Sequence, residues 1–262
     1  MGAQDYIEYQ AQHANHKIKV SFTGDVFEIA PDLAVGLIVV PQVANTDRDD
    51  EVQGLLKHME REITESGLEK STISQLPSIA AWRQVYSQFG AKPAKYPCAA
   101  ESLLKRVIEH GSLPRVHTIV DLCNAIALKS RTPIAACDIQ GIQELTIRKA
   151  TGSEPYLPIG KPEEPEMASE GEIIYADEFG RAHSRRWNWR QSDSVKVTRE
   201  SSSMLFTVEA VHKEAKVLVE ATTNLLFDLL HPFSSGPSKI AFGFISAETP
   251  TFEYHFQERG AN

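Results

Sequence analysis

Apolar residues in this chain follow two different spacings, and each spacing dominates in a different part of the sequence. Between residues 52 and 128 they recur every three or four positions, which is the period of an amphipathic helix. We expect helices over residues 52–63, 78–89, 99–108 and 116–128. After residue 145, short β-branched or aromatic runs stand between glycines and prolines, as is typical of strands. This separation predicts an α+β fold, with a mixed sheet and packed helices.

Further elements can be placed by the same reasoning. Residues 33–40 form a β-branched apolar run, and residues 217–230 carry leucines and valines at helical spacing. Additional strands are expected at 145–149, 172–175 and 203–210. The segment 155–171 is rich in prolines and acidic residues without periodicity, so we expect a surface loop or flap there. A single domain spanning residues 1–262 fits the length of 262 residues.

Composition and charge exclude several classes of protein. With 42% hydrophobic and 24% charged residues, the chain has enough apolar side chains to form a core. Its longest apolar runs are far shorter than the roughly 20 residues that cross a bilayer. The amino terminus lacks a basic start followed by an apolar run. We therefore expect a cytoplasmic protein with no membrane partner. The net charge of −8 disfavours a protein that coats nucleic-acid duplexes, although the segment from Arg181 to Arg190 is locally basic.

The common motifs for cofactors and metals do not occur in the sequence. There is no Walker loop, no GxGxxG, HExxH or GxSxG motif, and no metal-spaced group of cysteines and histidines. We expect no cofactor and no metal ion. The three cysteines show no CxxC spacing, and their odd number forms no closed disulfide set. They are expected to be reduced core thiols, while Cys98 has a second interpretation as a nucleophile at the start of a helix.

Several polar side chains lie within apolar segments and are candidates for a pocket. Asp121 and Asn124 belong to the segment IVDLCNAIAL, and Asp138 follows a second apolar stretch. An unpaired polar group in such surroundings costs about 1–3 kcal/mol, so each group needs a partner. The partner is either an internal hydrogen bond or a ligand. Glu209 lies in an apolar strand and faces either solvent or a pocket, where it would bind a substrate hydroxyl or amine.

The sequence RRWNWR, which begins at Arg185, interleaves guanidinium groups with indole rings. Both kinds of side chain stack on bases, and arginine also binds anions. Trp187 and Trp189 are therefore either anchors of a core strand with cation–π partners, or a platform for a substrate or for the 3′ end of an RNA.

These features occur in an order that resembles a known family. The segments LPRVHTIVDLCNAIALKSRTPIAACDIQGI, GEIIY, RRWNWRQSDSVKVT and LFTVEA resemble the B3/B4 domain of the phenylalanyl-tRNA synthetase β subunit. The freestanding B3/B4 proteins are more similar still. The resemblance covers residues 75–211 well and implies a B3/B4-like fold. It also implies a module that edits or binds aminoacyl-tRNA, because the synthetase domain hydrolyses tRNA charged with tyrosine in place of phenylalanine.

The resemblance assigns a role to Glu209 and reveals three departures. Glu209 matches a strand glutamate that recognises the extra hydroxyl, so its implied role is specificity rather than proton transfer. Ala135 stands where the synthetase domain has a histidine, the bulky segment from Trp187 to Arg190 stands where it has a glycine-rich turn, and no Thr-x-Ala element follows Glu209. Hydrolysis and binding without turnover therefore both stay open.

The expected partner is the 3′ end of an aminoacyl-tRNA or an amino-acid-like ligand. Our leading interpretation is trans-editing hydrolysis of a mischarged tRNA, in which bound water attacks the ester while Asn188 and Arg190 stabilise the oxyanion. The residues expected to bind the substrate or support its pocket are Glu209, Asn124, Asp121, Asp138, Trp187 and Trp189. The alternatives are a noncatalytic module for tRNA or an amino-acid-like ligand, and a hydrolase of small esters or amides. The sequence does not specify the amino acid, the tRNA or the oligomeric state.

Overall fold

Two four-stranded sheets form the centre of the computed structural model, which describes residues 17–44, 49–235 and 240–256. The expectation about the amino terminus lies outside these residues. The first sheet has the order β12 (Thr251–His255), β1 (Lys17–Phe22), β4 (Glu144–Lys149) and β7 (Ile173–Asp177). Strand β1 runs parallel to β4, and the other pairings are antiparallel, so we call this the mixed sheet.

The second sheet is antiparallel throughout. Its order is β11 (Ala241–Ile245), β2 (Ala34–Val40), β10 (Met204–Ala210) and β3 (Ile134–Asp138). Two short pairs complete the strands: β5 (Pro155–Tyr156) with β6 (Glu166–Met167), and β8 (Ser184–Arg185) with β9 (Arg190–Gln191).

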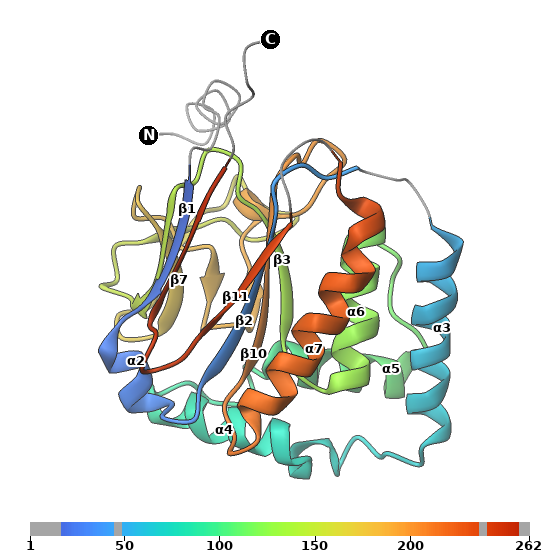
Figure 1. Cartoon of the computed structure of the whole chain (residues 1–262). Helices are drawn as coiled ribbons and strands as arrows, with labels where there is room; N and C mark the ends of the chain where they lie inside the picture. The colour runs from blue at the N-terminus through green and yellow to red at the C-terminus, as the bar shows by residue number, and fades with distance from the viewer. Residues whose placement is uncertain (1–16, 45–48, 236–239, 257–262) are drawn as a thin grey trace.

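Helices cover one face of the antiparallel sheet and close the end of the space between the sheets. They are α2 (Gly24–Ile29), α3 (Asp50–Glu65), α4 (Pro77–Gln88), α5 (Ala99–His110), α6 (Thr118–Ser130) and α7 (Ala215–Leu230). Figure 1 shows α6 and α7 side by side against the antiparallel sheet, with α3 outside α6. Asp49 is the N-cap residue of helix α3, and its carboxylate accepts a hydrogen bond from the backbone N–H of Val52 at 3.0 Å.

Alternation along the strands divides the core into two layers. In β2, Val35, Leu37 and Val39 face the mixed sheet, while Ile38 and Val40 pack against the helices. All five are at most 1% exposed, and burying each side chain stabilises the fold by about 1.5–3 kcal/mol. Strand β2 is therefore buried on both faces, which explains why residues 33–40 form a continuous apolar run.

The α+β fold predicted from the sequence is confirmed. The five helices expected from periodicity and the strands expected at 33–40, 145–149, 172–175 and 203–210 are present, with ends shifted by a few residues. Strands β1, β3, β11 and β12 were not predicted. The segment 155–171 is not purely a loop, because it contains the β5–β6 pair. None of the helices in the described part of the chain has the length and apolar character needed to span a membrane.

Candidate functional site

A pocket of about 200 Å³ lies beside β3, the edge strand of the antiparallel sheet. Side chains from α6, β3, β4, β7, β10 and the segment 183–191 line it. The lining includes Val120, Cys123, Asn124, Ala135, Cys137, Leu145, Tyr175, His183, Trp187, Asn188, Trp189, Arg190, Gln191, Leu205, Thr207 and Glu209. Six of the eight residues that the sequence suggested are thus brought together.

Glu209 forms the floor of this pocket. Leu205, Thr207 and Glu209 alternate along β10 onto the face that looks toward the mixed sheet, so Glu209 is only 2% exposed. Its Oε1 accepts hydrogen bonds from the hydroxyl of Tyr175 and from Nε1–H of Trp187 at 2.8 Å. Its Oε2 accepts one from the amide of Asn188 at 3.0 Å. Burial raises the pKa of Glu209, and these three donors oppose that rise.

The donors on Glu209 leave one acceptor position. A carboxylate has about four lone-pair positions, two on each oxygen. Two are used on Oε1 and one is used on Oε2. One position on Oε2 is therefore left for a donor in the pocket.

Asn188 connects the pocket floor to the helices. Its Nδ2 donates to Glu209, while its Oδ1 accepts a hydrogen bond from the hydroxyl of Tyr86 at 2.9 Å and a long one from the backbone N–H of Ala99 at 3.5 Å. Tyr86 belongs to α4 and Ala99 begins α5. The amide is thus engaged at both ends by the protein itself.

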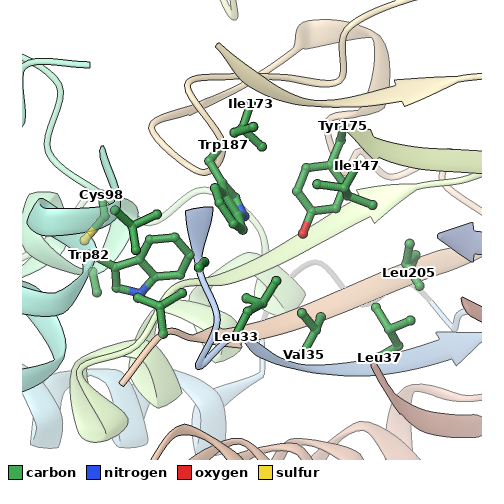
Figure 2. Packing of buried hydrophobic residues seen from close by; sticks show 14 of the residues in the cluster. Leu33, Val35, Leu37, Trp82, Cys98, Ile147, Ile173, Tyr175, Trp187 and Leu205 are labelled. Atoms are coloured by element: carbon green, nitrogen blue, oxygen red, sulfur yellow. The ribbon is translucent and has the colours of Figure 1, made fainter. Parts of the chain in front are cut away.

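Trp187 is a core residue. Its side chain is fully buried and meets Trp82 edge to face, with ring centroids 5.2 Å apart. Figure 2 shows Trp187 between Trp82 and Tyr175, surrounded by aliphatic side chains. The backbone reaches this position through two consecutive left-handed residues, Arg186 with φ 47° and Trp187 with φ 66°. Such a conformation costs about 1–3 kcal/mol for each non-glycine residue, so the surrounding contacts must hold it in place.

Trp189 lies at the mouth of the pocket, half-buried, within a cluster of aromatic rings and guanidinium groups. Its ring meets Tyr96 edge to face with centroids 4.8 Å apart, and Arg190 lies 4.4 Å above its face. Arg186 lies 3.8 Å above Tyr96 and 5.1 Å from the ring of Trp189. We call Tyr96, Arg186, Trp189 and Arg190 the aromatic–cationic rim. Arg190 is exposed, so its guanidinium is accessible to an anion.

The remaining candidate residues take different places. Asn124 of α6 lines the pocket. Asp121 lies in the first turn of the same helix and accepts hydrogen bonds from Gln53 at 2.8 Å and from the backbone N–H of Val116 at 3.2 Å. Asp138 accepts one from the backbone N–H of Gln140 at 2.9 Å, and burial raises its pKa. Neither aspartate is part of the pocket lining.

The locally basic segment is largely neutralised by internal acids. Arg181 and His183 both bind Asp177, at 2.5 and 2.9 Å. Arg185 is buried and pairs with Glu172, and with Glu166 at 2.7 Å. Of the arginines from 181 to 190, Arg190 presents the most exposed guanidinium at the pocket.

The interpretation of Cys98 as a nucleophile is wrong. The side chain is 2% exposed, and burial raises the pKa of its thiol to about 12. Burial likewise raises the pKa of Cys137 in the pocket wall to about 12, and that of Cys123 further. At neutral pH these thiols are protonated, and the thiolate is the reactive form.

Sequence reasoning missed three residues of the site. Tyr175 and Tyr86 donate hydrogen bonds to Glu209 and Asn188, and His183 lies in the pocket wall. Period-two alternation within residues 172–175 places Tyr175 on an interior face, but no local signal pairs it with Glu209, which is 34 positions away. Within residues 17–44, 49–235 and 240–256, no group of three His, Cys, Asp or Glu side chains is arranged to hold a metal ion.

Comparisons with known proteins place the chain in a family. No curated protein matches it in sequence. Among solved structures, it is similar to an N-terminal fragment of the phenylalanyl-tRNA synthetase beta-subunit from Pyrococcus horikoshii, with 12% identity and a TM-score of 0.44. That match covers 86% of this chain, and the chain spans 55% of the length of that structure. The family model described as the B3/4 domain matches residues 81–224, which is more than half of the chain, so this protein belongs to the B3/4 domain family.

Proposed function

We propose that the pocket binds the aminoacyl end of a charged tRNA and that the protein hydrolyses the ester bond of a mischarged one in trans, in the cytoplasm. The observation that carries this proposal is the buried carboxylate of Glu209, which keeps one acceptor position at the floor of a small pocket. A volume of about 200 Å³ lies below the 300–1,000 Å³ typical of sites for whole drug-sized ligands. It suits a single amino-acid side chain rather than a nucleotide.

The floor of the pocket would select the amino acid. A side chain that carries a hydroxyl or amine at its end would donate to Oε2 of Glu209, and an isostere without the donor would leave that position unpaired in a buried site. A site of this kind rejects the analogue that lacks the donor far more strongly than an apolar pocket rejects an added group. Tyr175, Trp187 and Asn188 hold the carboxylate in place for this purpose.

The aromatic–cationic rim would hold the 3′ end of the RNA outside the pocket. Exposed bases stack on aromatic side chains and guanidinium planes, and each stacked base contributes about 1–3 kcal/mol. Trp189 and Tyr96 offer ring surfaces, and Arg190 offers a charge beside them for a phosphate or for the developing oxyanion. Asn188 supports the floor instead of contributing to this charge, because its amide is already engaged by Glu209 and Tyr86.

Deacylation of a panel of correctly and incorrectly charged tRNAs tests the proposal. We expect faster release from one mischarged species, and we expect Arg190→Ala to reduce both binding and turnover. Glu209→Gln should reduce the difference in deacylation rate between that mischarged tRNA and the correctly charged one. Arg61→Ala, on the exposed surface of α3, is the matched control for lost positive charge and should behave as the wild type. Release at the spontaneous rate across the whole panel would refute the hydrolysis.

A second candidate function, binding without turnover, is favoured by one observation. The amide of Asn188 and the three thiols, which would otherwise serve as donor and nucleophiles, are occupied or protonated. The salt dependence of affinity separates tRNA from a free amino-acid-like ligand or small ester. Contacts to phosphates weaken steeply as salt rises, whereas binding of a small ligand in the pocket does not.

A further inference from the structure

A histidine lies in the pocket wall with one of its ring nitrogens unused. His183 pairs with Tyr175 across the turn that follows β7, because its backbone N–H donates to the carbonyl of Tyr175 at 2.7 Å. Residues opposite each other in such a pair share one face, and so do residues two apart in a strand. Tyr175, Asp177 and His183 therefore lie on the face that looks toward the antiparallel sheet, and His183 lines the pocket with 2% exposure.

Asp177 determines which ring nitrogen carries the proton. Its Oδ2 lies 2.9 Å from Nε2 of His183, and it also binds Arg181 and the backbone N–H of Phe179. Although burial raises the pKa of Asp177, hydrogen bonds from His183 and Arg181 and the positive charge of Arg181 lower it to about 2, so the carboxylate accepts hydrogen bonds. An accepting carboxylate requires the proton on Nε2, so in the neutral form of the ring, which is the form that acts as a base, Nδ1 carries the lone pair.

Nδ1 of His183 is the atom left without a partner. It is buried, and no hydrogen-bonding group among the described residues reaches it. A buried polar atom without a partner costs about 1–3 kcal/mol. Because His183 lines the pocket, a ligand or a water bound there is the candidate for the missing hydrogen bond.

We propose that His183 is the general base of the hydrolysis, with Asp177 as its positioning residue; this inference rests on the proposed deacylase function. Nδ1 accepts a proton from a water molecule as the water oxygen forms a bond to the ester carbonyl carbon. The bond from that carbon to the ribose oxygen then breaks, and the imidazolium returns the proton to the leaving oxygen. One water is consumed, and the products are the free amino acid and a tRNA with a free hydroxyl.

The other titratable groups around the pocket are less suited to this role. They are Asp177, Arg181, Tyr175, Glu209, Arg190, Cys123 and Cys137. Arg190 has no acceptor for a proton, and burial raises the pKa of the Cys123 thiol. Arg181 and Asp177 stay charged and paired with each other. Burial raises the pKa of Tyr175 and of Cys137, so neither gives up a proton at neutral pH. Glu209 already accepts three hydrogen bonds from fixed donors.

The experiment compares His183→Gln with His212→Gln on the mischarged tRNA that the wild type hydrolyses fastest. His212 is a matched control, since its Nδ1 is also buried without a partner among the described residues but lines a separate hollow near the start of α7. General-base catalysis contributes about 10²–10⁴-fold to a rate. We expect His183→Gln to lower kcat by that factor with little change in KM, and His212→Gln to leave both unchanged.

Two further measurements distinguish loss of the base from a folding defect, and distinguish failure of this inference from failure of the proposed function. Affinity for phenylalanine or tyrosine joined to adenosine by a stable 3′-amide bond should be the same in wild type and His183→Gln, because the base acts after binding. Asp177→Asn should lower kcat, and ¹⁵N NMR of the imidazole should show the proton moving from Nε2 to Nδ1. Normal turnover by His183→Gln would overturn the role of His183 while leaving the deacylase function intact. No turnover by the wild type would overturn both.

Discussion

Replacing Glu209 with alanine tests the central feature of the pocket. The change leaves three buried donors without their acceptor: the hydroxyl of Tyr175, Nε1–H of Trp187 and Nδ2–H of Asn188. Each such group costs about 1–3 kcal/mol, and removal of a buried charge returns part of the loss. We expect a net loss of about 3 kcal/mol in the free energy of unfolding at pH 7. At about 2–4 °C per kcal/mol, the melting temperature should fall by about 6–12 °C.

Urea and thermal unfolding followed by circular dichroism measure this loss. Glu209→Gln should cost about 1–2 kcal/mol, because the amide keeps one oxygen for Tyr175 and Trp187 but turns a donor toward Asn188. Glu200→Ala, which removes an exposed acidic side chain, is the control and should have the same urea midpoint and melting temperature as the wild type. If Glu209→Ala lies within 1 kcal/mol of wild type, the three donors do not depend on the carboxylate, and the description of the pocket floor fails.

The pH dependence of the free energy of unfolding, compared between wild type and Glu209→Gln, gives a second test. Burial raises the pKa of Glu209 above its unfolded value of about 4.3, so the folded state binds more protons above that pH. Wild type should therefore lose stability relative to Glu209→Gln as the pH rises from about 4 toward the raised pKa. A difference that grows in the opposite direction would contradict a buried carboxylate.

Three other substitutions give direct tests. Gly36→Ala should cost about 1–3 kcal/mol, since its Cβ would lie 1.9 Å from Oγ1 of Thr223 in α7, and adding Thr223→Ala should recover most of this loss in urea unfolding. Trp187→Phe should cost at least about 1–3 kcal/mol, because the fused pyrrole ring and its N–H donor to Glu209 are both lost from a fully buried site, and an unchanged melting temperature would contradict the hydrogen bond. Asp177, with a pKa of about 2 against the ordinary 3.8, should contribute about 2 kcal/mol that is present above pH 4 and lost as the pH falls toward 2, so acid unfolding of wild type and Asp177→Asn should converge there.

The helices could be predicted because their signal is local. Each of the five expected helices buries a stripe of apolar residues, and a stripe repeats within a dozen residues of sequence. Strand β3 could not be found in this way, since its sequence IAACD has small residues and only partial burial. Strands β11 and β12 lie at sheet edges with alternating exposure, and their partners β2 and β1 are more than 200 residues away. Pairing at such distances has no signature in a single segment.

Most of the pocket residues that the sequence suggested lie together, but the hydrogen bonds between them could not be predicted. Glu209, Asn188 and Trp187 stood out because each is polar or aromatic in an unusual setting. Their bonding to one another depends on the left-handed backbone at Arg186 and Trp187, which the sequence predicts poorly because neither residue is glycine. His183 could not be identified from the sequence for a different reason. What distinguishes it is its contact with Asp177, which engages Nε2 of the ring and leaves Nδ1 without a partner among the described residues.

Trp187 belongs to the hydrophobic core and also donates to the carboxylate at the pocket floor. Under the proposed function, a mutation that alters which ligand the pocket floor binds also alters the packing between the two sheets. The rim residues Trp189 and Arg190 are outside this constraint, because they lie half-buried and exposed at the pocket mouth. During evolution, or in a laboratory selection for a new substrate, changes should accumulate first at the rim, and changes at the floor should require stabilising substitutions elsewhere in the chain.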